Sequence, residues 1–406
     1  MEKSNKTKLL FVIESLKPAG AEKSLVTLLN LIDPERFDID LQLFSYGGEF
    51  ESMLPSYVTL LPELPYFKAC EGSLIQTVSL APRGKRFRYL FSRIAYSIDI
   101  RTKKYTNPEK AVRFWKHCGR CFDKCDKTYD FAIAYAQGVP TFYVADCVYP
   151  AEKRFAWVNV DYRPGWKART FSLERYRRIN RISCVSDTAK ETFTGHFPEL
   201  SDKCTVIRDI NDSRTITKMS CLPSDAENEM SAGKIRLLTV GRLAAQKGYD
   251  IAVEACRILK ERGVDFTWYV LGKGPLENDV RALISKHSLE GRFVLLGTRS
   301  NPYPYFRMAD IYVQTSRHEG FGLAIAEARI LNVPVVTTEF DSVYQQMKNG
   351  ENGLVVGMNA VSVAEGIERL ITDRGLYQHI KDFLKLEKND DYQELDKFYA
   401  LIRPES

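Results

Sequence analysis

The chain has 406 residues, more than one hydrophobic core usually organises, so two or three domains are expected and two suit the strand pattern better. Hydrophobic residues make up 44% and charged residues 27% of the chain, a balance that excludes disordered and fibrous proteins. The net charge of +6 is modest, but it is distributed unevenly along the chain.

No apolar segment approaches the roughly 18 uninterrupted residues that a membrane span requires. Near the start, the apolar run at residues 9–13 stops at Glu14, as in a strand rather than a signal peptide. The nine cysteines are odd in number and scattered, which indicates reduced thiols rather than a disulfide framework. We therefore expect a cytoplasmic protein, and peripheral contact with the inner face of the plasma membrane stays open.

The first half alternates predicted strands and helices. Residues 8–16 predict a buried strand, and the turn that follows, with Pro18 and Gly20, opens a helix. Free amides at that helix start favour anions, although the spacing fits no phosphate-loop motif and an ordinary strand-to-helix turn stays open. Further strands are predicted at 38–44, 59–61, 131–135, 155–160, 182–185 and 204–207, and this alternation favours a parallel doubly wound sheet.

A basic, apparently helical insertion at residues 81–127 interrupts this pattern. It carries fourteen Lys and Arg residues interleaved with aromatic residues. Solvated helices whose aromatic residues face a core are one interpretation; an anionic membrane surface or acceptor is a second, and nucleic acid is less favoured. Within it, His117, Cys118, Cys121 and Cys125 could bind zinc, but no second ligand pair follows, so buried thiols on one helix face are preferred.

The second half repeats the architecture without repeating the sequence. Residues 213–233 have no hydrophobic periodicity and predict a linker between a domain at 1–212 and a second at 234–385. Strands are predicted at 235–240, 266–271, 293–296, 311–314, 333–337 and 354–356. A helix within 386–406 is expected to pack back towards the first domain. The fold class is thus α/β, with two doubly wound Rossmann-like domains facing each other across a cleft.

Successive strand ends of the second half carry glycines and cations. Gly241, Arg242 and Lys247 follow the first strand, where two cations could neutralise a diphosphate and stabilise charge that grows as a phosphate leaves. Solvated surface charges are the alternative. Gly272 and Gly274 close the next strand, and Arg299 follows the one after it.

Residues 316–328 predict a loop that becomes a helix after a fourth strand. Glu319 would lie in the loop and Glu327 in the second or third helical turn, so the two carboxylates could bind separate hydroxyl groups. Gly320 and Gly322 flank Phe321 and let the backbone approach a ligand closely. Taken alone, an ordinary glycine-rich loop with solvated glutamates would explain the segment equally well. Its place beside three similar strand ends favours a site for a polyhydroxylated substrate.

Several motifs of the second half occur together in one known family. SRHEGFGLAIAEA contains Glu319 and Glu327 with the E-x7-E spacing, and GRLAAQKG, LGKGP, NPYPYF and ENGLVV accompany it. Jointly they resemble the retaining glycosyltransferases of family 4, which have the GT-B fold. The resemblance covers nearly the whole chain and is strongest from Arg242 to about Leu354.

The resemblance implies a nucleotide-sugar donor, with a UDP-sugar expected, and no metal or other cofactor. By resemblance, Arg242 and Lys247 hold the diphosphate, Glu327 the ribose hydroxyls and Glu319 the hydroxyls of the transferred sugar. The backbone at Phe321, Gly322 and Leu323 contacts phosphate and sugar, and Gly20 approaches from the first domain. The remaining expected donor contacts are Gly241, Gly272, Gly274, Arg299 and Gly320.

Two departures from the family pattern fall in the first half. The first loop has Ala19-Gly20-Ala21-Glu22 where relatives often have Gly-Gly-Ala-Glu. Where many relatives carry a histidine, this chain has Asn159, which can hydrogen-bond but carries no charge, with Asp161 as a candidate partial substitute.

The expected activity is retaining transfer of a sugar to a hydroxyl of a glycan or lipid-linked glycan in cell-surface polysaccharide synthesis. Arg242, Lys247, Glu319, Asn159 and Asp161 are the expected catalytic residues. A binding or scaffold protein with weakened catalysis is one alternative. Another GT-B enzyme, such as a sugar-nucleotide epimerase or a glycogen-type phosphorylase, is a second.

Overall fold

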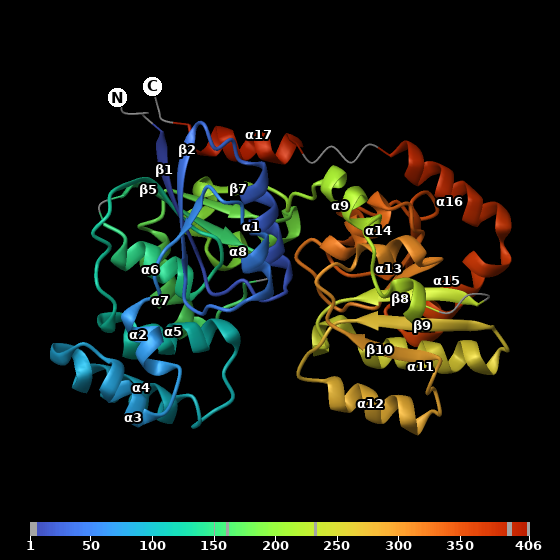
Figure 1. Cartoon of the computed structure of the whole chain (residues 1–406), viewed down its shortest axis with the longest axis horizontal. Helices are drawn as coiled ribbons and strands as arrows, with labels where there is room; N and C mark the ends of the chain where they lie inside the picture. The colour runs from blue at the N-terminus through green and yellow to red at the C-terminus, as the bar shows by residue number, and fades with distance from the viewer. Residues whose placement is uncertain (1–5, 150, 160–161, 231–233, 388–391, 404–406) are drawn as a thin grey trace. The chain divides into compact units, whose positions relative to one another are not determined.

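The computed structural model describes residues 6–149, 151–159, 162–230, 234–387 and 392–403. The chain divides into two compact units, one formed by Met1–Asp209 with Glu394–Ser406 and the other by Ile210–Gln393. Each unit contains one parallel sheet with helices packed against it (Figure 1). The α/β fold class with two Rossmann-like domains, predicted from the alternation of strands and helices, is therefore confirmed.

The sheet of the first unit has seven parallel strands in the order β3-β2-β1-β4-β5-β6-β7. The order reverses direction at β1, as in a doubly wound sheet, and the central strands are almost wholly buried because helices cover both faces. The strands are β1 (Thr7–Ile13), β2 (Phe37–Leu43), β3 (Val58–Leu60), β4 (Tyr129–Ala134), β5 (Ala151–Val158), β6 (Arg181–Cys184) and β7 (Cys204–Val206).

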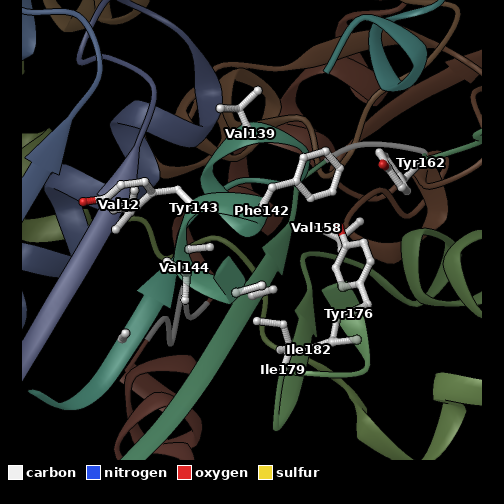
Figure 2. Packing of buried hydrophobic residues seen from close by; sticks show 14 of the residues in the cluster. Val12, Val139, Phe142, Tyr143, Val144, Val158, Tyr162, Tyr176, Ile179 and Ile182 are labelled. Carbon is white, nitrogen blue, oxygen red and sulfur yellow. The ribbon is translucent and has the colours of Figure 1, made fainter. Parts of the chain in front are cut away.

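One core of the first unit lies between this sheet and the helix that follows β4. That helix, α6, is buried almost all round, and Figure 2 shows Phe142 and Val144 from it beside Val158 and Ile182 from the strands. The helices of the unit are α1 (Gly20–Leu31), α2 (Pro65–Cys70), α3 (Leu74–Leu80), α4 (Arg86–Asp99), α5 (Asn107–Cys118), α6 (Val139–Cys147), α7 (Trp166–Tyr176), α8 (Asp187–His196) and α17 (Tyr392–Leu401).

The insertion at 81–127 contains α4 and α5. Some of its aromatic residues are buried in a core, and others are exposed to solvent. Tyr89 and Trp115 are buried in cores of the first unit, while Phe87 and Phe91 are exposed. The interpretation that its aromatic residues face a core is therefore correct for only part of the set.

The cysteines of the insertion do not share one helix face, contrary to the sequence expectation. α5 ends at Cys118, a 3-10 helix covers Gly119–Cys121, and Cys125 lies beyond both. Cys118 and Cys121 are buried beside Tyr66 and Ser92, and burial raises the pKa of both thiols. Among the described residues no three His, Cys, Asp or Glu side chains gather as a metal site.

The sheet of the second unit has six parallel strands in the order β10-β9-β8-β11-β12-β13. The strands are β8 (Ile235–Val240), β9 (Phe266–Leu271), β10 (Phe293–Gly297), β11 (Ile311–Gln314), β12 (Val335–Thr338) and β13 (Gly353–Val356). The helices are α9 (Ser213–Ser220), α10 (Ala226–Glu229), α11 (Tyr249–Glu261), α12 (Glu277–Lys286), α13 (Tyr303–Met308), α14 (Leu323–Ile330), α15 (Ala360–Thr372) and α16 (Arg374–Leu386).

Two helices, α9 and α10, occupy the stretch where the sequence predicted a linker. The side chain of Asp212 caps α9 by accepting hydrogen bonds from the amides of Arg214 and Thr215 at 3.1 Å. Ile216 and Met230 are buried in a core of the second unit. These helices are too short to show periodicity in the sequence, and their packing against α13 and α14 stabilises them.

The last helix, α17, packs against the first sheet from Glu394 onward (Figure 1). The ring of Phe398 is wholly buried and lies 6.1 Å from that of Phe11 on β1, centroid to centroid. The hydroxyl of Tyr399 accepts a hydrogen bond from the amide of Asp33 at 3.0 Å. Among the helices of the described ranges, none combines the length and the apolar composition needed to cross a bilayer.

Substitution Phe398→Ala should destabilise the first unit by roughly 3–5 kcal/mol, because it leaves a cavity between α17 and the first sheet. Urea unfolding followed by circular dichroism measures the change in the free energy of unfolding. Asp396→Ala, an exposed position on the same helix, is the control and should change it by less than about 0.5 kcal/mol. Equal stability of the two variants would show that α17 does not contribute to the core.

Candidate functional site

Three loops at the carboxyl edge of the second sheet form the candidate site. They follow β8, β9 and β11, and β8 lies between the other two strands in the sheet. Because all three strands are parallel, the loops that follow them are neighbours. The structure thus brings together the segments 241–248, 272–276 and 315–322, in which the sequence analysis placed most of the donor-binding residues.

The loop after β8 is fastened to the loop after β11 by its backbone. The hydroxyl of Thr315 donates to the carbonyl of Lys247 at 3.0 Å, and the amide of Arg317 donates to the carbonyl of Gln246 at 2.7 Å. Gly248 has φ +63°, and a Cβ there would lie 2.1 Å from the carbonyl oxygen of Thr315. Only glycine allows the two loops to approach this closely.

Gly272 and Gly274 pack against the same loop from the other side. A Cβ on Gly272 would lie 2.0 Å from the carbonyl oxygen of Gly241, and one on Gly274 would lie 2.3 Å from that of Leu243. The structure therefore explains both glycines by the contact of one loop with another. A direct contact of these glycines with the donor stays a prediction.

Glu319 is the most constrained carboxylate of the site, with its side chain only 8% exposed. One oxygen, Oε1, accepts three hydrogen bonds: from Lys247 Nζ at 2.6 Å, from Gln314 Nε2 at 2.8 Å and from Ser316 Oγ at 2.5 Å. The other oxygen, Oε2, accepts no hydrogen bond from any residue in the described ranges. The carboxylate is thus held in one orientation while one of its oxygens keeps its acceptor capacity.

Tyr312, on β11, lies in the field of both glutamates of the E-x7-E spacing. Burial, followed by the negative charge of Glu319 and a smaller effect of Glu327, raises the pKa of the Tyr312 phenol well above its ordinary value. The phenol therefore stays protonated and donates to Gln314 Oε1 at 2.7 Å. Glu327 is itself buried in the second turn of α14, so both carboxylates lie near the head of this helix.

The start of α14 completes the site. Gly322 precedes the helix with φ +89°, a conformation that favours glycine, and the first N–H groups of the helix have no partner within it. The carbonyls of the preceding loop are held elsewhere. Ser342 Oγ donates to the carbonyl of Glu319 at 3.0 Å, and Gln346 Nε2 donates to those of Phe321 and Gly322, the latter at 3.3 Å.

Sequence reasoning missed Ser342 and Gln346, as well as Gln314 and Ser316. Gln314 is the last residue of β11 and Ser316 follows it by two, so the strand-end rule applied to the other loops could have found both. Ser342 and Gln346 follow β12 with no recognisable motif. Their role depends on contacts with a distant loop, which no local pattern reveals.

The two arginines predicted for the donor site have different surroundings. Arg242 is exposed and makes no hydrogen bond or ion pair with any residue that the structure describes, so its guanidinium is free to meet an anion. Arg299 instead forms an ion pair with Glu229 and donates from Nε to the hydroxyl of Tyr305 at 3.0 Å. Its guanidinium thus holds α10 against α13, a structural role that the sequence did not indicate.

The residues predicted for the first domain lie in the first unit. Gly20 is the exposed first residue of α1. Asn159 follows β5, and its Nδ2 donates to the carbonyl of Tyr135 at 2.7 Å, while Oδ1 has no hydrogen-bond partner among the described residues. Asp161 lies outside the described residues. The structure therefore fixes the orientation of the Asn159 amide and leaves its acceptor unpaired.

Comparisons with known proteins identify relatives of the segment that contains this site. Residues 223–385 match the family described as glycosyl transferases group 1. The alpha-D-kanosaminyltransferase of Streptomyces kanamyceticus is 28% identical over 171 residues, which cover 39% of this chain and 44% of that protein. The lipopolysaccharide core biosynthesis glycosyltransferase LpsE of Rhizobium meliloti is 30% identical over 141 residues, which cover 34% of this chain and 40% of that protein.

Similarity in structure extends over nearly the whole chain. HepE of Anabaena, solved in complex with UDP-glucose, superposes with a TM-score of 0.71 and 18% identity, covering 97% of this chain and 99% of that one. The chain spans less than half of the length of these two curated relatives, and the residues that match the family lie in the second unit. Residues 223–385, which contain the three loops of the site, therefore form a glycosyl transferases group 1 domain in a chain with the GT-B fold.

Proposed function

We propose that this protein is a retaining glycosyltransferase of family 4, which moves a sugar from a nucleotide-diphosphate sugar to a hydroxyl group of an acceptor. The observation that carries the proposal is the pairing of Lys247 Nζ with Glu319 Oε1 at 2.6 Å beside the head of α14. A cation for a phosphate and an oriented carboxylate for a hydroxyl are thus held at one place.

The diphosphate of the donor binds to Lys247, to Arg242 and to the free amides at the start of α14. Arg242 has no competing partner among the described residues, and its planar fork suits phosphate oxygens. Negative charge increases on the diphosphate as the bond to the sugar breaks. Cations and amides that are already in place stabilise that charge more in the transition state than in the ground state.

The two carboxylates bind hydroxyl groups of the donor. Glu319 Oε2, which has no partner among the described residues, accepts from the transferred sugar, and Oε1 keeps the carboxylate oriented through its three hydrogen bonds. Glu327 accepts from the ribose. Backbone groups of Phe321, Gly322 and Leu323 complete the contacts.

Transfer proceeds with retention of configuration. The acceptor hydroxyl attacks the anomeric carbon from the face that the nucleotide leaves, and the departing phosphate oxygen takes the proton of that hydroxyl. The new glycosidic bond replaces the bond to the diphosphate, so no covalent enzyme intermediate is required. The protein contributes positioning and charge stabilisation, without a metal ion.

The donor base is uridine and the acceptor a glycan or lipid-linked glycan of the cell surface. HepE of Anabaena, which was solved with UDP-glucose, supports the choice of base. LpsE of Rhizobium meliloti, a lipopolysaccharide core biosynthesis glycosyltransferase, supports the class of acceptor. Such an acceptor places the enzyme in the cytoplasm, at the inner face of the plasma membrane.

A binding or scaffold protein with weakened catalysis is the second candidate. Asn159 favours it, because an amide occupies the position where many relatives carry a histidine and an amide does not exchange protons near neutral pH. Another GT-B enzyme, such as a sugar-nucleotide epimerase, would change the sugar without transferring it.

Incubation with a panel of UDP- and GDP-sugars separates these candidates. Without an acceptor, a transferase slowly hydrolyses its donor and releases the nucleoside diphosphate. We expect this release from a UDP-sugar, and we expect it to continue when EDTA is present. NMR of the first sugar product should show the anomeric configuration of the donor. Release of an altered sugar would identify an epimerase, and tight UDP binding without turnover would identify a binding protein.

Lys247→Ala and Arg242→Ala should each lower kcat for donor turnover by about 100-fold or more, since each removes a charge that stabilises the leaving diphosphate. Steady-state kinetics with the preferred donor measures the effect. Lys286→Ala, an exposed lysine on α12, removes the same charge outside the site and should leave kcat unchanged. Near-normal rates in both site variants would refute the donor assignment.

Glu319→Gln should lower kcat/KM for the donor about 100-fold while changing the affinity for UDP by less than about fivefold, because the sugar contact weakens and the ribose contact stays. Calorimetric titration with UDP and steady-state kinetics separate the two effects. Glu351→Gln, in an exposed turn, is the matched control. If the affinity for UDP falls as much as the activity does, Glu319 contacts the nucleotide rather than the transferred sugar.

A further inference from the structure

Two consecutive helices of the first unit, α3 and α4, expose large apolar side chains to solvent. Ile75 is 82% and Phe87 76% exposed. Leu74, Leu80, Phe91 and Ile98 are exposed as well. Single exposed apolar side chains are common on proteins, but a group of this size on two neighbouring helices marks an interaction surface. We call it the α3–α4 surface.

Helix α4 has two apolar faces. One packs against the rest of the first unit, and the other is exposed to solvent. Tyr89 and Ser92 are buried against Tyr66 and the thiols of Cys118 and Cys121. Phe87, Phe91 and Ile98 are spaced four and seven residues apart, so they form a separate stripe along the helix. An ordinary surface helix has polar residues there.

Arg93 fastens the two helices together. Its Nη1 donates to the carbonyl of Ser73 at 3.1 Å, and its Nη2 donates to the carbonyl of Gly72. Figure 1 shows α3 and α4 side by side at the end of the first unit, and both α2 and α5 contact α4. The exposed stripe is therefore presented on a fixed support.

Cations accompany these apolar side chains, and acids are missing between residues 72 and 98. The cations there are Arg83, Lys85, Arg86, Arg88 and Arg93. Arg83 and Arg88 are exposed and form no ion pair with any residue that the structure describes. An apolar stripe beside free cations is the composition of helices that lie on anionic membranes.

We propose that the α3–α4 surface docks this protein on an anionic lipid bilayer. Ile75, Phe87 and Phe91 enter the boundary between headgroups and acyl chains, and Arg83 and Arg88 contact the lipid phosphates. A second copy of the chain fits less well. A symmetric contact would place the same patch, with the same cations, against itself.

The inference does not rest on the donor site, since α3 and α4 belong to the first unit and the donor-binding loops to the second. It does agree with a lipid-linked acceptor. A protein held at the bilayer searches for such an acceptor along the membrane surface rather than through the whole volume of the solution.

Vesicle sedimentation tests the proposal. The full chain is mixed with vesicles of phosphatidylcholine, with or without roughly one quarter phosphatidylglycerol, and centrifuged. We expect binding to the anionic vesicles and a marked loss of binding at about 1 M salt, where the screening length falls to roughly 3 Å. Equal failure to bind both kinds of vesicle at low salt would overturn the proposal.

Matched variants identify the surface. Ile75→Glu and Phe87→Glu should each weaken vesicle binding about tenfold or more, because an apolar side chain no longer leaves water. The controls are Leu386→Glu and Trp166→Glu, which alter side chains that are 83% and 77% exposed elsewhere, and they should bind as the wild type does. Arg83→Ser and Arg88→Ser should each weaken binding about fivefold.

Two further measurements keep the outcomes distinct. Size-exclusion chromatography over a range of protein concentrations detects a dimer, and a dimer that Phe87→Glu abolishes would assign the surface to a second copy. Lys247→Ala protein should bind vesicles as tightly as the wild type. If the wild type binds vesicles but does not turn over any donor, the proposed function alone is refuted. If the wild type turns over a donor but does not bind vesicles, the docking surface alone is refuted.

Discussion

The ion pair between Lys247 and Glu319 is the interaction on which the candidate site depends. It joins the loops after β8 and β11, two strands that are neighbours in the sheet but more than 60 residues apart in sequence. Neither partner is well solvated, with the Lys247 side chain 21% exposed and that of Glu319 8%. Such a pair is stable only where further hydrogen bonds satisfy its atoms, and Gln314 and Ser316 provide them.

Backbone contacts set the positions of these two charges. Gly248 lets the Lys247 loop touch the carbonyl of Thr315, and Gly272 lets the loop after β9 support the same loop from the opposite side. Gln346 holds the carbonyls ahead of α14 and is itself tied to Asn352, whose Nδ2 donates to the Gln346 carbonyl at 3.0 Å. Hydrogen bonds and glycines thus position the head of α14, and the Arg329 guanidinium donates to Gln346 Oε1 at 3.4 Å.

The two units offer different kinds of surface to a ligand or partner. The second concentrates charges and free amides at one edge of a sheet, which suits a small anionic donor. The first adds a helical insertion in which one side of α4 completes an aromatic core and the other remains apolar and exposed. A stripe such as Phe87 and Phe91 raises the free energy of the chain in water, so its presence is best explained by a partner that covers it.

The fold class, the positions of nearly all strands and the two strand ends that are followed by Arg242, Lys247, Glu319 and Glu327 could be predicted from the sequence. Strand positions follow from local apolar runs, and glycines and charges at strand ends are visible without contacts. Which groups contact one another became visible in the folded chain alone. Arg299 pairs with Glu229, Gly272 serves loop packing, α9 and α10 replace a linker, and Cys125 leaves the helix of Cys118. Each of these depends on a partner distant in sequence, whose place is set by the packing of whole helices and strands rather than by local pattern.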